Sequence, residues 1–483
     1  MKELAGIGPL ALGKLIQSRA ISCVEAVRHS LEVIQHREPQ CSTFLEVTGE
    51  QALAAAQKVQ KRIDSKDESL SPLAGVPMAV SDSVCVKGTA TTCGSKMLEG
   101  FRPPYSATVW ERLQAEGGVL LGKTALDEFI LGVSGENCAF GPARNPWDTR
   151  LASEGSAGAV SCGEAFYAVG SDGFGALRRS ASFCGVSSLR PTCGTVSRYG
   201  LVAGTSSLEQ AGIVGKTILD CAQVLALIRG KDSRDSTTVE APALDWKISL
   251  RGLRIGIPTA CFEGGLDPNI RQAVLAASKQ LEALGASLVP VELPLADDLL
   301  PTYYVVACGE ISSNLARYDG IRYGYRAKDV GDLMELYRQS RSRALGSQIK
   351  EHILLGNFFL SGEGGGDYHQ KALHARELIR RGFEDVFTRC HMILSPVVPT
   401  APRTIGEKPG NLLELYRQST FTAPAGLAGL PAATVPCGFD SKGIPIGFQL
   451  TGRPFGEGEL IAVAHGYQMA TDFHQRLPGE VGQ

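Results

Sequence analysis

The sequence has 483 residues, of which 43% are hydrophobic and 20% are charged, and its formal net charge is -2. This composition is typical of a soluble globular protein with a large core. Direct nucleic-acid binding has no electrostatic support, because phosphate binding needs a clustered basic surface. No apolar run approaches the roughly 18 residues of a membrane-spanning helix, so we expect no membrane association.

The N-terminal segment and the cysteines indicate a cytoplasmic protein. Residues 1–22 carry a Leu/Ile stripe interrupted by charged and polar residues, which predicts an amphipathic helix and not a signal peptide. The 13 cysteines are scattered singly, without a C-x-x-C motif or zinc spacing. We therefore expect reduced, buried thiols and neither a metal nor another cofactor.

The first half of the chain alternates helix and strand signals. Ser22 is a plausible N-cap within the first helical region, and Gly117 ends a later helix. The pattern predicts helices at 9–36, 50–64, 107–117 and 162–170, and strands at 44–47, 73–84, 118–124 and 183–189. The strand at 183–189 is predicted to lie at a sheet edge.

The second half begins with a strand, helix and strand that predict a right-handed parallel crossover. The helix begins after Asp267, a good N-cap followed by proline, and ends before Gly285. Residues 302–385 are mostly helical and polar, which predicts a separate helical layer. The other predicted elements are strands at 253–258, 286–293, 392–400 and 431–439, and a closing helix at 458–478.

Residues 150–185 are rich in Gly, Ser and Ala, which suits a pocket wall where backbone approaches backbone or ligand closely. Yet common catalytic and cofactor motifs are missing from the chain. There is no P-loop, H-E-x-x-H, G-x-S-x-G or dinucleotide-binding fingerprint, and the eight histidines form no constellation. These widespread motifs therefore indicate neither a reaction type nor a cofactor for this protein.

Eight longer segments do carry a resemblance to a known family. They are LAGVPMAV, TTCGSKMLEGFRPPYSATVWERLQAEGGVLLGKTALDEF, ENCAFGPARNPWD, FCGVSSLRPTCGTVSRYGLV, SSLEQAGIVGKT, SSNLARYDGIRYGY, LAGLPAATVPCGF and TGRPFGEGELIAVAHGYQMATDFHQ. The first five resemble the amidase signature family. The last three resemble its tRNA-dependent branch, the A subunits of glutamyl-tRNA(Gln) and aspartyl-tRNA(Asn) amidotransferases.

The resemblance implies a fold and partners. We expect an α/β protein with a large mixed sheet covered by helices on both faces. The whole of 1–483 would form one amidase signature domain, with 302–385 as a helical layer or insertion within it. The implied partners are B- and C-subunit-like proteins of a tRNA amidotransferase.

Family members hydrolyse amides with a Ser–cis-Ser–Lys triad, and the flanking motifs place each member here. Ser81 stands where the family has its lysine base, and Ala176 stands where it has its nucleophilic serine. A gapless comparison places the relay serine at Gly155, next to Ser156, which could take over the relay. Lys87 lies off the motif. The implied triad is therefore degenerate at all three positions.

The substrate-binding positions implied by the family are altered as well. The oxyanion stretch reads Gly173-Phe174-Gly175, with a bulky ring where the substrate carbonyl would approach. Ser419 replaces an aspartate that would hold the amino group of glutamine, and Glu351 replaces an arginine that would hold its carboxylate. Since such a pocket relies on charge pairing, we expect little affinity for glutamine.

Three functions remain open. The combined losses favour a non-catalytic homologue of the amidotransferase protein, acting as a structural or regulatory partner. The alternative is an active, glutamine-hydrolysing component of the transamidation complex that forms Gln-tRNA(Gln). A third is a small-ligand binding protein in which Phe174, Arg178 and Arg179 of the altered cleft favour an anionic or aromatic ligand, although Arg178 is better explained as structural.

Overall fold

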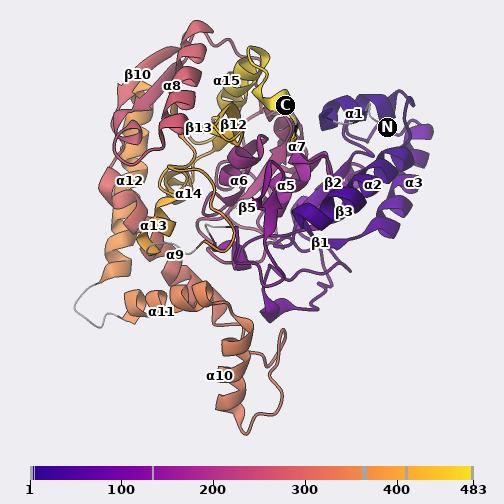
Figure 1. Ribbon diagram of the computed structural model, residues 1–483, viewed down its shortest axis with the longest axis vertical. Coiled ribbons are helices and arrows are strands. Elements are labelled where there is room, and N and C mark those ends of the chain that lie inside the picture. Colours follow the sequence, from indigo (N-terminus) through magenta and orange to yellow (C-terminus); the bar gives the residue numbers. More distant parts are fainter. Residues whose placement is uncertain (1–3, 5, 133–134, 362–366, 408–411, 480–483) are drawn as a thin grey trace.

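The structure, a computed structural model, describes residues 4, 6–132, 135–361, 367–407 and 412–479. Its centre is an 11-stranded mixed sheet in the order β1-β3-β2-β6-β8-β7-β12-β13-β11-β9-β10, and β4 and β5 form a separate pair (Figure 1). The strands are β1 Phe44–Val47, β2 Pro77–Ser81, β3 Val119–Thr124, β4 Ala143–Asn145, β5 Asp148–Ser153, β6 Tyr167–Ser171, β7 Ser187–Arg190, β8 Ala211–Gly215, β9 Arg254–Pro258, β10 Ser287–Val291, β11 Met392–Pro396, β12 Ala432–Phe439 and β13 Pro445–Gly452.

Helices flank this sheet. They are α1 Pro9–Gln17, α2 Cys23–Cys41, α3 Gly49–Asp64, α4 Thr108–Ala115, α5 Gly155–Ser161, α6 Ala176–Cys184, α7 Ile218–Ile228, α8 Pro268–Ala283, α9 Leu299–Leu315, α10 Leu333–Ala344, α11 Ser347–Ser361, α12 Tyr368–Arg389, α13 Leu412–Arg417, α14 Ala423–Ala428 and α15 Glu457–Met469. On one face, α7 and α15 contact each other and pack on β7, β8, β12 and β13. On the other face, α5 and α6 form a pair over β2, β6, β7 and β13. The predicted α/β architecture is confirmed.

Local capping signals place several helix starts where the sequence predicts them. The Ser22 hydroxyl accepts a hydrogen bond from the Glu25 N–H while the Glu25 carboxylate accepts one from the Ser22 N–H, which forms a capping box. Asp267 caps α8, and Gly285 follows its C-cap with φ +104°. The strands β9 and β10 around α8 pair in parallel, which confirms the predicted parallel connection, and its right-handedness stays a prediction.

Two predicted elements are wrong. Residues 162–170, predicted as a helix, contain the strand β6, and the helix α5 precedes them. The strand predicted for 183–189 is not at an edge, because β7 lies between β8 and β12 near the middle of the sheet. Helices cover both faces of the sheet at β6 and β7, so neither strand alternates between apolar and polar residues. A short buried segment without this alternation does not distinguish a strand from a helix.

The region 302–385 is occupied mainly by the helices α9 to α12, and its assignment as a separate layer or insertion stays a prediction. The helix α9 packs against α11, α12 and α14, and α10 projects below the rest of the protein in Figure 1. Buried apolar side chains of α9, α11 and α12 belong to a second core cluster, separate from the larger cluster around the central strands. The assignment of 1–483 to one domain stays a prediction.

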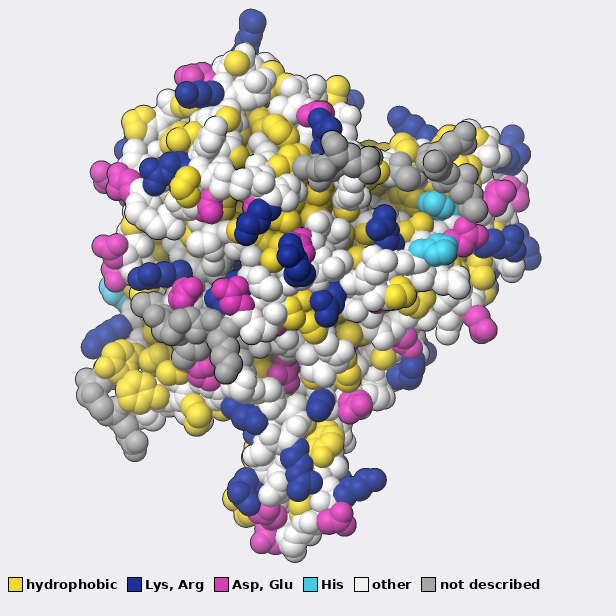
Figure 2. All heavy atoms as spheres, in the orientation of Figure 1, with side chains coloured by type: hydrophobic (Ala, Val, Ile, Leu, Met, Phe, Trp, Pro, Cys, Tyr) yellow, Lys and Arg dark blue, Asp and Glu magenta, His cyan; other side chains and the backbone are white. Residues whose placement is uncertain are grey.

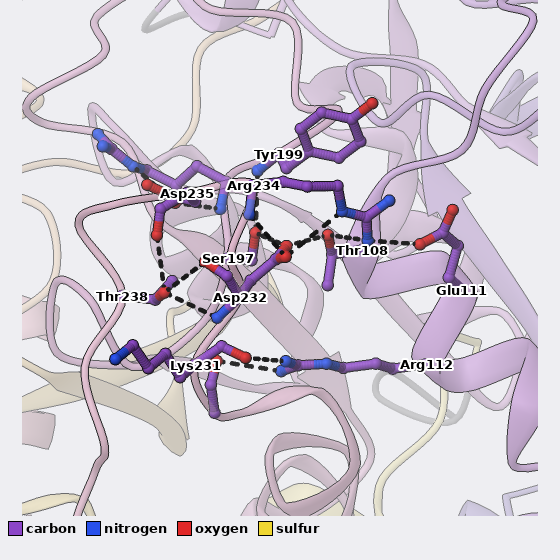
Figure 3. Close-up of polar contacts among 12 residues, drawn as sticks. Thr108, Glu111, Arg112, Ser197, Tyr199, Lys231, Asp232, Arg234, Asp235 and Thr238 are labelled. Atoms are coloured by element: carbon purple, nitrogen blue, oxygen red, sulfur yellow. Dashed lines mark hydrogen bonds and ion pairs between the residues drawn. The ribbon is translucent and has the colours of Figure 1, made fainter.

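A polar cluster fastens the loop after α7 to the start of α4 (Figure 3). The Asp232 carboxylate accepts hydrogen bonds from the hydroxyls of Thr108 and Ser197. The Arg234 guanidinium donates to the Thr108 hydroxyl at 2.8 Å and forms an ion pair with Glu111 at 2.6 Å. Since Thr108 and Glu111 both belong to the first turn of α4, this cluster holds the helix to the loop after α7.

Charges of both signs are mixed over the face shown in Figure 2, where Lys and Arg side chains lie among Asp and Glu side chains. Among the described residues, no helix combines the length and the apolar composition needed to cross a membrane.

Candidate functional site

The turn between β6 and α6 carries the implied nucleophile position, and its geometry is tightly held. Gly175 has φ +79°, and a Cβ there would lie 2.3 Å from the Cβ of Thr422, so no other residue fits without movement. The Arg178 guanidinium donates to both carboxylate oxygens of Asp172, at 2.8 and 3.3 Å, and to the Gln449 side-chain oxygen at 2.7 Å. Arg178 is fully buried, so its role is structural.

Ala176 lines a cavity of about 40 Å³ beside this turn. Since one water occupies about 30 Å³ in the liquid, the cavity holds on the order of one water molecule. Its wall combines the end of β5, the first turns of α6 and three loops. The lining residues are Asp127, Gly135, Ala152, Ser153, Glu154, Ala176, Arg179, Ser180, Phe183, Pro402, Arg403 and Gln418.

The hydroxyl groups of this cavity bond to one another and to the backbone. Ser153 and Ser180 share a hydrogen bond of 3.0 Å, and the Ser153 hydroxyl also lies 3.1 Å from the Cys184 sulfur. The Ser180 hydroxyl accepts a bond of 2.9 Å from the backbone N–H of Glu154. Neither a lysine nor a histidine is among the described residues that line the cavity. A conventional base for activating a serine is therefore missing from this wall.

Charged side chains line the same cavity. Burial raises the pKa of Glu154 to about 8; the nearby Asp127 raises it further, whereas Arg179 opposes the shift. Burial also raises the pKa of Asp127, although its carboxylate accepts hydrogen bonds from the N–H groups of Asn137 at 2.7 Å and Gly135 at 2.9 Å. Glu154 is thus mainly protonated at neutral pH, and it presents a neutral carboxyl group to the cavity.

The implied base position does not lie on this cavity wall. Ser81 ends β2, and its hydroxyl lies 3.2 Å from the hydroxyl of Ser83. The nearby Lys123 is fully buried, and its ammonium donates to the Val84 carbonyl at 2.7 Å and to the Asp82 carboxylate at 3.2 Å. Lys123 therefore serves the scaffold. Lys87 lines a different surface groove.

Gly155 begins α5 and lies against the backbone of other segments, and its assignment as the relay position stays a prediction. A Cβ at this position would lie 2.2 Å from the Thr43 carbonyl oxygen and 2.6 Å from the Ala125 nitrogen, so a serine has no room there. Ser156 bonds to the Thr124 hydroxyl at 2.8 Å and does not line the cavity. Ser153, the last residue of β5, does line it.

The Phe174 ring does not occupy the cavity, which corrects the expectation that it blocks the approach of a carbonyl. It is fully buried and packs edge-on against Tyr303, with ring centroids 4.9 Å apart. The ring centroids of Tyr304 and His352 lie 5.8 and 6.4 Å from that of Phe174, and the Tyr416 ring lies tilted against Tyr304 with a centroid distance of 4.0 Å. We call these five side chains the aromatic cluster.

The implied recognition positions border the aromatic cluster. Glu351 precedes His352 on α11, and its carboxylate accepts a hydrogen bond of 3.3 Å from the Tyr416 hydroxyl. Ser419 is fully buried, three residues after Tyr416, and its hydroxyl has no partner among the described residues. Residue 351 is distant in sequence from Tyr416, and the fold brings the two side chains into contact.

Similarity to known proteins extends over nearly the whole chain. The family described as Amidase matches residues 25–461. The chain belongs to the amidase family. The A subunit of glutamyl-tRNA(Gln) amidotransferase from Synechococcus sp. (strain WH7803) is 46% identical over 95% of this chain and 96% of its own length. The corresponding protein of Moorella thermoacetica is 44% identical over 97% of both chains.

A solved structure supports the same membership. The crystal structure of the glutamyl-tRNA(Gln) amidotransferase A subunit from Thermotoga maritima is 31% identical, with a TM-score of 0.77 over 95% of this chain and 97% of that one. The resemblance stated from the sequence is therefore confirmed for this member of the amidase family. Within the described part of the chain, no group of His, Cys, Asp or Glu side chains has an arrangement that could hold a metal ion.

Proposed function

We propose that this amidase-family chain is a component of a tRNA-amidotransferase-type assembly and does not itself hydrolyse glutamine. The observation that carries the proposal is the cavity beside α6, where Ala176 presents a methyl group at the implied nucleophile position. Ser81 at the implied base position lies outside this cavity. An alanine cannot form the covalent acyl intermediate on which the triad mechanism depends.

The surroundings of the implied glutamine pocket support the same proposal. Aromatic rings, and not charged groups, border Glu351, whose carboxylate accepts a hydrogen bond from Tyr416, whereas a zwitterionic substrate would need charged partners. Glu351 would repel the carboxylate of glutamine, and the Ser419 hydroxyl carries no charge. An amino acid would thus lose its hydration there without gaining ion pairs, which is costly in a buried site.

The proposed role is that of a structural or regulatory partner of B- and C-subunit-like proteins in the cytoplasm. The similarity to proteins named as amidotransferase subunits supports it, since it extends over nearly the whole chain at 44 to 46% identity.

An active glutaminase is the second candidate, and one observation favours it. Ser153 lines the Ala176 cavity and is hydrogen-bonded to Ser180, so this wall does carry hydroxyl groups. A small-ligand binding protein is the third candidate. Arg179 and Glu154 would face its ligand, whereas Arg178 is occupied by Asp172 and would not.

The deciding experiment is ammonia release from glutamine by the purified chain, alone and mixed with B and C subunits. We expect no release above that of the Ser153→Ala variant prepared in parallel. Release by the natural chain that Ser153→Ala abolishes would establish the active alternative. Co-elution of the chain with B and C subunits in size-exclusion chromatography tests the assembly, and separate elution would remove that part of the proposal.

A further inference from the structure

A second cavity of about 220 Å³ lies beside β11 and β13, and it shares no lining residue with the Ala176 cavity. It is enclosed by β9, β11 and β13 of the sheet, by α9 and α12, and by the segment between α13 and α14. These helices stand beside the strands on the left of the molecule in Figure 1. Nothing in the proposed function uses this cavity.

Apolar side chains form most of its wall. Leu299 and Leu300 come from α9, Phe383 from α12 and Ile393 from β11, and Phe421 closes the side next to α14. Leu299, Phe383 and Ile393 are each less than 5% exposed. For comparison, an engineered apolar cavity of about 150 Å³ binds benzene. The space here accommodates a ring with a short substituent.

The sheet supplies a polar end to this otherwise apolar cavity. The Ser395 hydroxyl donates to the Pro396 carbonyl at 3.0 Å, and the Gln449 amide nitrogen donates to the Phe421 carbonyl at 2.9 Å. Thr451 is only 6% exposed, and its hydroxyl has no hydrogen-bond partner among the described residues. Because Thr451 lies in the cavity wall, its hydroxyl offers a partner to a ligand with one hydrogen-bonding group.

The charges around the cavity restrict the ligand further. Asp297 is the charged residue in its lining, and neither a lysine, an arginine nor a histidine lines it among the residues described. A carboxylate or phosphate would therefore be buried without a cation and close to an acid. Ala260 and Asp297 are exposed and mark the side from which a ligand would enter.

We propose that this cavity binds a small uncharged molecule with a ring-sized hydrocarbon body and one hydroxyl or amide group. The hydrocarbon body packs against Leu299, Phe383 and Ile393, and the polar group bonds to Thr451 on β13. Such a division between many apolar contacts and few polar ones is typical of small-molecule sites.

The test uses benzyl alcohol as probe, with toluene and benzoate as comparisons of similar size, and measures binding to the full chain by saturation-transfer NMR titration. We expect saturable binding of benzyl alcohol in the millimolar range and much weaker binding of benzoate. Thr451→Val removes the hydroxyl at nearly constant shape, so it should weaken benzyl alcohol binding roughly 2- to 10-fold and leave toluene binding unchanged.

Ala260→Trp should obstruct the entrance and abolish binding, and it leaves the core intact because Ala260 is exposed. The matched control is Ala283→Trp at an exposed position of α8, which should bind benzyl alcohol like the natural chain. Absence of saturable binding, or binding that neither Thr451→Val nor Ala260→Trp changes, would overturn the proposal. Binding of benzoate as tight as that of benzyl alcohol would overturn the ligand class.

Discussion

Glu154 shows how a single residue couples the site to the stability of the fold. Its carboxyl group is only 6% exposed and lines the cavity next to Ala176. Burial raises its pKa from the ordinary value of 4.5 to about 8, with Asp127 adding to the shift and Arg179 opposing it. Between these two pH values the folded chain holds a proton that the unfolded chain has released. The free energy of unfolding therefore falls as pH rises through this window.

Glu154→Gln should remove this dependence, because an amide does not titrate. We expect the natural chain to lose more stability than the variant between pH 5 and pH 8, by up to about 1.4 kcal/mol per pH unit within that range. Urea unfolding at pH 5, 6.5 and 8 measures the difference. Glu164 and Glu209 have raised pKa values of about 8 and 7 and remain in both proteins, so the comparison isolates Glu154. Parallel curves for the two proteins would contradict the assignment.

At the scale of elements, buried polar contacts of loops hold helices in place. The turn from β6 to α6 is held by the Asp172–Arg178 ion pair, which is nearly fully buried. The loop after α7 is held to α4 by the carboxylate of Asp232, whose side chain is 7% exposed. The first contact fixes α6 to the turn before it. The second fixes α4 to the loop after α7.

Asp232→Asn should weaken the attachment of α4. The amide keeps one acceptor but loses the charge that strengthens the bonds from Thr108, Ser197 and Arg234, so we expect a loss of about 2 kcal/mol in the free energy of unfolding. Urea denaturation checks this value. Glu263→Gln, at an exposed position, is the control and should change stability by less than about 0.5 kcal/mol. Equal effects of both variants would refute the structural role of Asp232.

At the scale of the whole molecule, stability is unevenly distributed. The central strands lie in the larger core cluster, and β6, β7 and β8 are buried along their full length. The helix α10 buries only Leu336, Ser340 and Ala344, while Leu333 and Met334 are 64% and 76% exposed. Since α10 also projects from the body (Figure 1), few contacts oppose its local opening.

Native-state hydrogen exchange should separate these two regions. We expect the amides of α10 to exchange through local opening at low cost, and those of β6 and β8 to exchange only with global unfolding. Peptide-resolved mass spectrometry after deuterium labelling gives both rates in one experiment. The helix α8, which packs on β12 and β13, serves as an internal helical reference and should stay protected. Protection of α10 equal to that of α8 would contradict the expected order.

The sequence by itself determined those features that depend on residue identity or on close neighbours. Ser22 and Asp267 cap their helices because their side chains bond to N–H groups two or three residues away. Long matching segments established the family and its α/β architecture. The lack of a nucleophile at position 176 also follows from identity alone, since no conformation gives an alanine a hydroxyl group.

Only the tertiary structure decided which distant residues meet. It placed Ser153, at the end of β5, in the wall of the Ala176 cavity, and Gly155, at the start of α5, against the Thr43 and Ala125 backbone. It placed the Phe174 ring within the aromatic cluster, whose other rings come from residues more than 100 positions away in the sequence. It also put β7 inside the sheet. Such placements depend on contacts between remote segments, and no local pattern of residues encodes them.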